Sequence, residues 1–159
     1  MIDTSSPTPV PAIDLPAWEI RLAREAELAA QVLPHNKDVL FDALAAAGIA
    51  VVVVVFDGYG DSGQIEDVQS RNDDLDIALP PDQIEIAVVE WGADEPQRIA
   101  VSVRDAVERL AYAFLAETHA GWENNDGAYG EFTFSVADRT ISLDYNERMM
   151  TSESYGHQW

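Results

Sequence analysis

Two glycine-rich segments contain most of the side chains that could bind a ligand or carry out acid–base chemistry. Residues 57–67 read Asp-Gly-Tyr-Gly-Asp-Ser-Gly-Gln-Ile-Glu-Asp, and residues 122–131 read Trp-Glu-Asn-Asn-Asp-Gly-Ala-Tyr-Gly-Glu. If both lie at the same end of a sheet, their carboxylates can converge with Asp144, and their glycines let the backbone approach a ligand closely. Aromatic rings among polar residues and glycines are more typical of an interaction surface than of a catalytic pocket. The predicted partner-binding residues are Asp57, Tyr59, Asp61, Gln64, Glu66, Asp67, Trp122, Glu123, Asn124, Asn125, Asp126, Tyr129, Glu131, Asp144 and Asn146.

The same residues have a purely structural interpretation, which the sequence leaves open. Trp122 can cover the core, and asparagine and aspartate side chains can satisfy the backbone of turns. In a chain this acidic, turn residues also carry solvated charge without any ligand.

Calcium binding is an alternative function for these segments, because hard cations take several oxygen ligands on sharply turning loops. EF-hand spacing is not met. Counting from Asp57 places Ser62 where glycine is required and Val68 where a bidentate glutamate is required. A calcium site of another geometry stays open, and no other cofactor is predicted. Its candidate ligands are Asp57, Asp61, Glu66 and Asp126.

A small carboxylate-using enzyme is a third interpretation. Paired carboxylates such as Glu123 and Glu131 can do acid–base work, but an acidic chain contains many such pairs by chance. His119 lies nearby, at the end of a predicted helix, where the helix dipole already favours a cation. The sequence contains no cysteine, nucleophile elbow, phosphate loop, dinucleotide fingerprint or His-Glu-x-x-His motif. No catalytic residue is therefore predicted.

The charge of the chain restricts its partners. Nine basic residues stand against twenty-nine acidic ones, which gives a formal net charge of −20. Between Asp57 and Glu85, nine acidic residues stand against one arginine. Such a field repels nucleic acid and anionic membranes and attracts basic proteins or cations. We therefore expect a basic protein partner and no direct contact with nucleic acid or membrane, although solubility alone also explains such acidity.

The chain is expected to form a single domain over residues 15–148, between a disordered lead-in over residues 1–14 and a weakly ordered tail over residues 149–159. The lead-in is rich in serine and proline and lacks the apolar stretch of a secretory signal. The longest apolar run, residues 49–56, is too short to span a bilayer. A cytoplasmic location is expected.

The elements that position the two segments follow from hydrophobic periodicity. One helix is predicted from Pro16 to Leu33, Pro34 interrupts it, and Asn36 caps a second helix that ends before Gly48. Residues 49–56 predict a central strand covered on both faces. Residues 64–79 predict a short strand and a solvated loop, residues 84–91 a strand, residues 92–96 a turn and residues 97–119 a helix.

A hairpin with one apolar and one polar face ends the predicted domain. Its apolar face pairs Phe132 with Tyr145, Phe134 with Leu143 and Val136 with Ile141. The polar face carries Thr133, Ser135, Ser142, Asp144 and Asn146. These elements predict an α+β fold, a two-layer sandwich in which helices pack on one face of an antiparallel or mixed sheet of about four to five strands.

Three segments resemble an uncharacterised family of small acidic bacterial proteins associated with plasmids and mobile elements. They are residues 56–66, residues 122–134 and residues 143–148. Together with Gly121, the start of the second segment forms the pattern Gly-Trp-Glu-Asn-Asn-Asp-Gly-x-x-Gly-Glu. The resemblance implies an intracellular bacterial setting and a role in conflict between mobile elements and host defences, but no established activity.

The leading functional hypothesis is a non-enzymatic module that binds a basic protein through its acidic surface. The partner would be a host defence or nucleic-acid-binding protein, for which the carboxylates stand in for phosphates.

Overall fold

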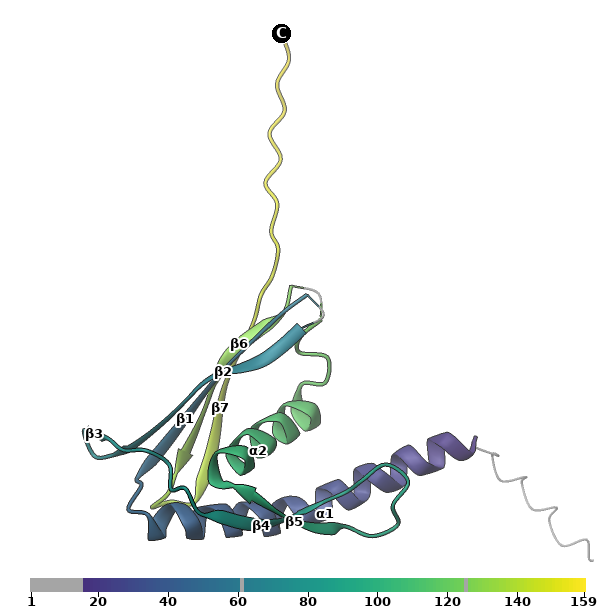
Figure 1. Cartoon of the computed structure of the whole chain (residues 1–159). Coiled ribbons are helices and arrows are strands. Elements are labelled where there is room, and N and C mark those ends of the chain that lie inside the picture. The colour runs from purple at the N-terminus through teal and green to yellow at the C-terminus, as the bar shows by residue number, and fades with distance from the viewer. Residues whose placement is uncertain (1–15, 61, 125) are drawn as a thin grey trace, which may run out of the picture.

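The computed structural model describes residues 16–60, 62–124 and 126–159, so the predicted lead-in lies outside the described residues. Two helices and several antiparallel strands form an α+β fold, as predicted (Figure 1). In chain order they are α1 (Ala17–Ala46), β1 (Val51–Tyr59), β2 (Ser62–Asn72), β3 (Leu75–Asp76), β4 (Gln83–Val88), β5 (Gln97–Ser102), α2 (Val103–Thr118), β6 (Ala128–Ser135) and β7 (Thr140–Glu147).

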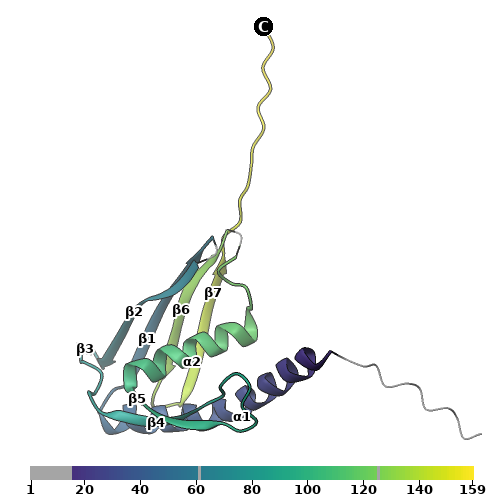
Figure 2. The same ribbon diagram turned by 45° about the vertical axis from the view of Figure 1, so that its right-hand side comes forward.

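Within the described part of the chain, five strands form an antiparallel main sheet in the order β3-β2-β1-β6-β7. Both helices lie on one side of this sheet, and none of the described residues forms a helix on its other side (Figures 1 and 2). The predicted strand over residues 84–91 does form, as β4, but it pairs only with β5 in a separate two-stranded ribbon. This ribbon packs against α1 and α2. The predicted sandwich is therefore confirmed, with an extra ribbon in the helical layer.

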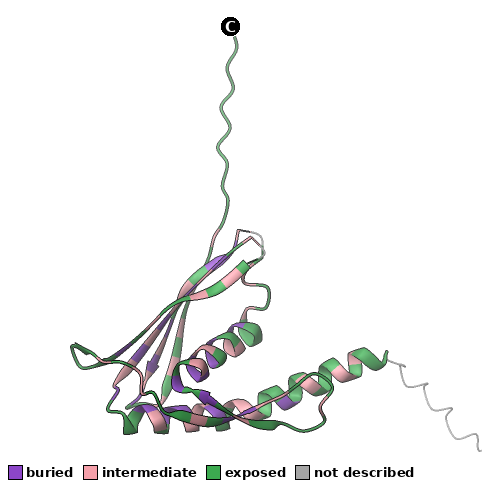
Figure 3. Cartoon of the chain, in the orientation of Figure 1, coloured by how far each residue is buried: buried purple, intermediate pink, exposed green. Residues whose placement is uncertain are grey.

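Strand β1 is central, as predicted, but only one of its faces is buried. Val52, Val54 and Phe56 are fully buried beneath the helices, whereas Val51 and Val53, on the other face, are half-buried (Figure 3). The expectation that both faces are covered was wrong. β-branched residues also favour strands for their backbone preference, so an unbroken run of them does not establish two covered faces.

Helix α1 is continuous, so the predicted interruption at Pro34 was wrong. Pro34 cannot donate to the carbonyl of Ala30, but both residues are exposed and water can solvate that carbonyl. Asn36 is not a cap either, because its buried amide binds the backbone of Ala87 in β4. The predicted stop at Gly48 is confirmed: it has φ +73°, and its N–H donates to Ala45 O while that of Ile49 donates to Leu44 O.

Residues 97–102 form β5 rather than the start of a helix. Ser102 caps α2 by accepting a hydrogen bond at Oγ from the Asp105 N–H at 3.0 Å. The five preceding residues pair with β4 instead. The correction moves the start of the long helix from Gln97 to Val103.

Most of the segment predicted as a short strand and a loop is the eleven-residue strand β2. Tyr59 pairs with Ser62, so β1 and β2 form a hairpin where an acidic loop was expected. Glu66 has no partner in β1, because Val55 pairs with Asp67 and Phe56 with Ile65. This bulge bends the strand, and next to it the Ile65 N–H donates to the Tyr112 hydroxyl of α2 at 2.9 Å.

The final hairpin has the predicted faces in a different register. Phe134 pairs with Ile141 and Phe132 with Leu143, a shift of two residues from the predicted pairing. The turn takes four residues because Val136 is buried and Arg139, at φ +53°, donates to Asp42 Oδ1 in α1 at 3.0 Å. A shift of two residues keeps every side chain on its face.

Beyond β7, residues 149–159 have neither helix nor strand and are exposed throughout, extending away from the sheet in Figure 1. In the described part of the chain, neither helix has both the length and the apolar character needed to cross a membrane.

Candidate functional site

The two glycine-rich segments meet at one end of the main sheet, which is the condition under which their carboxylates could converge with Asp144. β1 and β6 are antiparallel neighbours in which Asp57 pairs with Tyr129 and Gly58 with Ala128. The β1–β2 hairpin therefore ends where the loop before β6 enters the sheet (Figure 1).

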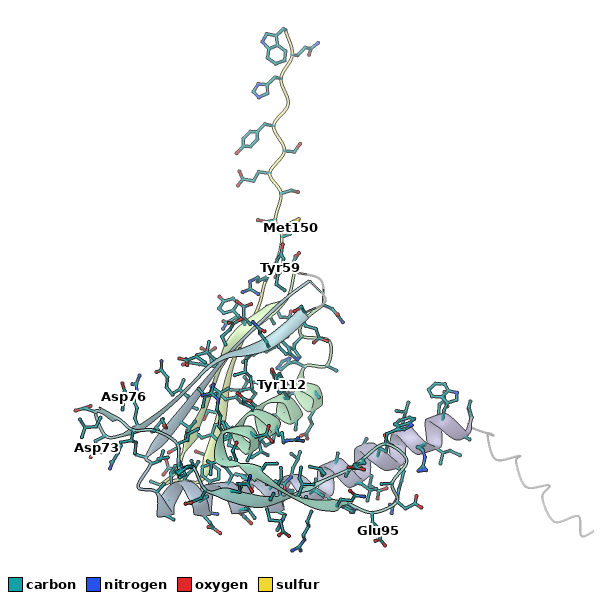
Figure 4. The ribbon with its side chains drawn as sticks, in the orientation of Figure 1. Tyr59, Asp73, Asp76, Glu95, Tyr112 and Met150 are labelled. Atoms are coloured by element: carbon teal, nitrogen blue, oxygen red, sulfur yellow. The ribbon has the colours of Figure 1, made fainter. Side chains whose placement is uncertain are left out.

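The sheet nevertheless divides the predicted residues between its two faces. Alternation along the paired strands places eight of them on the side away from the helices. These are Asp57, Tyr59, Gln64, Asp67, Tyr129, Glu131, Asp144 and Asn146. Figure 4 shows Tyr59 at the tip of the β1–β2 hairpin, far from the helical layer that holds Tyr112.

The remaining predicted residues lie elsewhere. Trp122 and Glu123 lie on the helical side, next to Gly58 and Gly63. Asp126 accepts a hydrogen bond at Oδ2 from the Met150 N–H at 3.0 Å. The other four are Asn124, in the loop before β6, Glu66, at the bulge, and Asp61 and Asn125, which lie outside the described residues.

The glycines of this end accommodate Trp122. Its ring packs edge-on against Phe56, with centroids 5.5 Å apart. A Cβ atom at Gly58 would lie 2.7 Å from the indole, so any larger residue there would displace the ring. A Cβ atom at Gly127, where φ is +82°, would overlap the Gly58 carbonyl. The interpretation of Trp122 as a cover for the core fits this packing. The group that approaches Gly58 closely is the Trp122 side chain of the same chain.

Three carboxylates form a row across the open side of the sheet. Val55 pairs with Asp67 on one side and with Glu131 on the other, and Glu131 pairs with Asp144. Neighbouring strands lie about 4.8 Å apart, and like charges directly opposite each other destabilise a sheet. In the described part of the chain, neither Glu131 nor Asp144 has a basic partner within ion-pair distance. The fold therefore retains a repulsive pair that neutral side chains would remove.

Arg148, which was not among the predicted residues, contacts the neighbouring cross-strand pair of Asp57 and Tyr129. Its Nη2 lies 2.8 Å from Asp57 Oδ1, and its Nη1 donates to Gly58 O at 2.9 Å. The guanidinium lies over the Tyr129 ring, 4.8 Å from the centroid. The sequence signal was a single arginine directly after an acidic strand. Arg148 neutralises Asp57 and leaves the carboxylate row as the uncompensated charge.

We call this surface the acidic sheet face and define it as Val55, Asp67, Glu131 and Asp144 with the adjoining Val53 and Thr133. Val53 pairs with Thr133, and both are half-buried. An apolar centre is thus bordered by acidic groups on the side of the sheet opposite α1 and α2 (Figure 2).

The residues considered for acid–base chemistry are not brought together. Glu131 lies on the open side of the sheet and Glu123 on the helical side. His119 ends α2 and stacks on Tyr145, with ring centroids 3.6 Å apart. Burial, followed by the charges of Glu147 and Glu123, raises the pKa of Tyr145 above its ordinary value, so this phenol stays protonated at neutral pH. The stacked pair supports the hairpin and does not extend the acidic sheet face.

Among the residues that the structure describes, no group of three or more histidine, aspartate or glutamate side chains is placed to hold a metal ion. Two of the four calcium candidates already bind within the chain, Asp57 to Arg148 and Asp126 to the Met150 N–H. Asp61 lies outside the described residues.

Millimolar calcium is therefore expected to leave the melting temperature unchanged when sodium chloride matches the ionic strength. A cation that binds only the folded state raises the melting temperature by mass action. Differential scanning fluorimetry with calcium and magnesium series checks this. A melting temperature that rises with calcium concentration but not with magnesium concentration would support a calcium site.

Comparison with known proteins places the chain in a family without assigning it an activity. No curated protein and no solved structure matches it. A model of a family of unknown function, DUF6878, matches residues 32–159, from the middle of α1 through both strands of the final hairpin and the C-terminal tail. This match spans the main sheet, the ribbon, α2 and the acidic sheet face, and the chain therefore belongs to the family of unknown function DUF6878.

Proposed function

We propose that this protein is a non-enzymatic binding module whose acidic sheet face docks onto a basic protein. The observation that carries the proposal is the row of Asp67, Glu131 and Asp144 around the half-buried Val55. Repulsion within this row lowers the stability of the folded chain, and a basic partner would remove that repulsion on binding.

The surface has the two components that a specific docking site needs. Val53 and Val55 supply apolar area at its centre, and the carboxylates around them supply orientation and fast encounter with a cationic partner. The formal charge of −20 adds a long-range field of the same sign. Its expected partner therefore presents apolar side chains within a ring of lysines and arginines.

The class of partner follows from the same charges. Proteins that bind nucleic acid present basic surfaces shaped to accept phosphates, and carboxylates on adjacent strands can occupy those positions. The resemblance to acidic proteins of plasmids and mobile elements supports a bacterial cytoplasmic setting and a host defence or nucleic-acid-binding protein as the target. Inhibition would then result from direct competition with nucleic acid.

Charge reversal on the acidic sheet face tests this function. The test variant carries Asp67→Lys, Glu131→Lys and Asp144→Lys. Its matched control carries Asp82→Lys, Glu90→Lys and Glu95→Lys, three exposed positions in and around the β4–β5 ribbon. Both variants have the same net charge, so only the location of the charge differs.

Wild type and control are expected to recover basic proteins from a bacterial lysate at low salt, and the test variant is expected to lose them. Raising the salt should weaken recovery, because screening reduces charge steering. A recovered nucleic-acid-binding protein should bind its DNA or RNA more weakly when the wild-type chain is added. Equal recovery by the test variant and the control would refute docking through this face.

The test variant should be about as stable as the wild type, because lysines at both positions 131 and 144 again place like charges opposite each other. Replacing one member of the Glu131–Asp144 pair with lysine turns repulsion into attraction, worth about 0.2–1 kcal/mol for a cross-strand pair. Urea unfolding of the single variant Glu131→Lys measures this directly. Loss of binding with unchanged or higher stability separates a lost surface from a lost fold.

A further inference from the structure

The N-terminal half of α1 presents an apolar stripe that the rest of the described chain leaves partly exposed. Trp18, Leu22, Ala26, Ala29 and Leu33 recur every three or four residues and so lie on one side of the helix. Trp18 is 59% exposed and Leu22 is 46% exposed. The first turns of α1 extend beyond the rest of the helical layer in Figures 1 and 2. The same side of α1 is therefore buried in the core in the C-terminal half of the helix and exposed to solvent in its N-terminal half.

An apolar groove of about 430 Å³ adjoins this stripe, between α1, β4 and α2. Small side chains form much of its wall, and its lining includes Ala26, Ala29, Ala30, Leu33, Ala113 and Ala116. Large exposed residues and a groove with small walls therefore lie on the same side of one helix, only a few turns apart.

We infer that a second copy of this chain occupies the groove, with the N-terminal half of its α1 antiparallel to the first. A two-fold axis near Ala26 brings Trp18 and Leu22 of each copy onto the groove of the other, so one pairing covers both stripes and fills both grooves. Alanine walls permit the close helix approach that this pairing requires.

The N-terminal half of α1 carries much less net negative charge than the rest of the molecule, which favours it as the surface for self-association. Residues 17–33 contain three glutamates and two arginines, which makes them nearly neutral in a chain of formal charge −20. Both arginines already have carboxylate partners, Arg21 with Asp94 and Arg24 with Glu27. The stripe therefore suits an apolar, nearly neutral occupant. Two copies repel each other through most other surfaces, and salt should strengthen their association by screening this repulsion.

Sedimentation velocity on the full chain tests the dimer. Wild type is expected to approach twice its 17.5 kDa mass as its concentration rises, more readily at high salt. Leu22→Glu on the projecting turns and Ala29→Glu in the groove should each raise the dissociation constant more than about tenfold, because each dimer would bury two unpaired carboxylates. Leu75→Glu, at a 71% exposed position in β3, should leave it unchanged.

Disulfide trapping tests the geometry. The chain has no cysteine, so a single introduced thiol can only link two copies. Mild oxidation of Ala26→Cys should give covalent dimers, since a residue near a two-fold axis meets its own copy, whereas Leu75→Cys should stay monomeric.

A wild-type monomer at the highest attainable concentration in high salt would overturn the inference, as would a dimer that both glutamate variants retain. Because the acidic sheet face lies on the other side of the sheet, the lysate experiment with its lysine variants succeeds or fails independently.

Discussion

Replacing Phe134 with alanine is expected to lower the free energy of unfolding by about 3–5 kcal/mol, the range for large-to-small substitutions of buried aromatic residues. Phe134 is fully buried, pairs with Val52 of the central strand, and its ring lies 6.2 Å from that of Phe41 in α1. The substitution would open a cavity where the sheet meets the helical layer. Urea unfolding followed by circular dichroism measures the loss.

Thr133→Ala is the matched control, because Thr133 is the preceding residue of β6 and is half-buried on the open side of the sheet. Its effect should be much smaller. Similar losses for both variants would contradict the assignment of the two faces and, with it, the position of the acidic sheet face.

Asn36→Ala is expected to lower the free energy of unfolding by about 2–4 kcal/mol, because a buried donor and a buried acceptor would each lose a partner. Asn36 Nδ2 donates to Ala87 O and Asn36 Oδ1 accepts from the Ala87 N–H, both at 2.8 Å. This pair of hydrogen bonds fixes β4 to α1. Thermal and urea unfolding measure the loss, and amide exchange in β4 should accelerate.

The neighbouring substitution His35→Ala provides the control, since His35 is exposed on the same turn of α1. We expect it to change stability by less than about 0.5 kcal/mol. An Asn36→Ala variant as stable as His35→Ala would show that water replaces the amide without loss. The anchoring role of Asn36 would then have to be abandoned.

The two proposed interactions use opposite layers of the molecule and respond to salt in opposite directions. Docking of a basic protein on the acidic sheet face should weaken as salt rises, since attraction between unlike charges is screened. Pairing of two copies through α1 should strengthen, because the screened force is repulsion between like charges. A salt series therefore separates the two interactions without any substitution.

Local patterning was sufficient for the position of the central strand and for the two faces of the final hairpin. The β-branched run predicted the central strand, and alternation in the final hairpin predicted which of its side chains are buried. The faces were correct even though the pairing was wrong by two residues, because side chains alternate with a period of two. The register itself depended on Val136 and Arg139, whose contacts with the core and with α1 lie far away in sequence.

Local rules failed where a distant strand supplied the stabilising contact. Pro34 and Asn36 together indicate a helix end followed by a cap, yet docking of α1 and the bond from Asn36 to Ala87 keep the helix continuous. Residues 97–102 continue the spacing of the following helix, and pairing with β4 makes them a strand. In both cases the deciding partner was β4, whose position the local sequence does not contain.

For the candidate site, the sequence by itself determined the residue types and the charge. The pairing of β1 with β6 decided that the two segments meet at one end of the sheet. Tertiary structure decided which carboxylates act together. Strand pairing joined Asp67, Glu131 and Asp144 around Val55 and neutralised Asp57 with Arg148, while packing on Gly58 placed Trp122 on the other side. Alternation within a strand is a local property, whereas neighbours across strands are set by pairing between segments far apart in the chain.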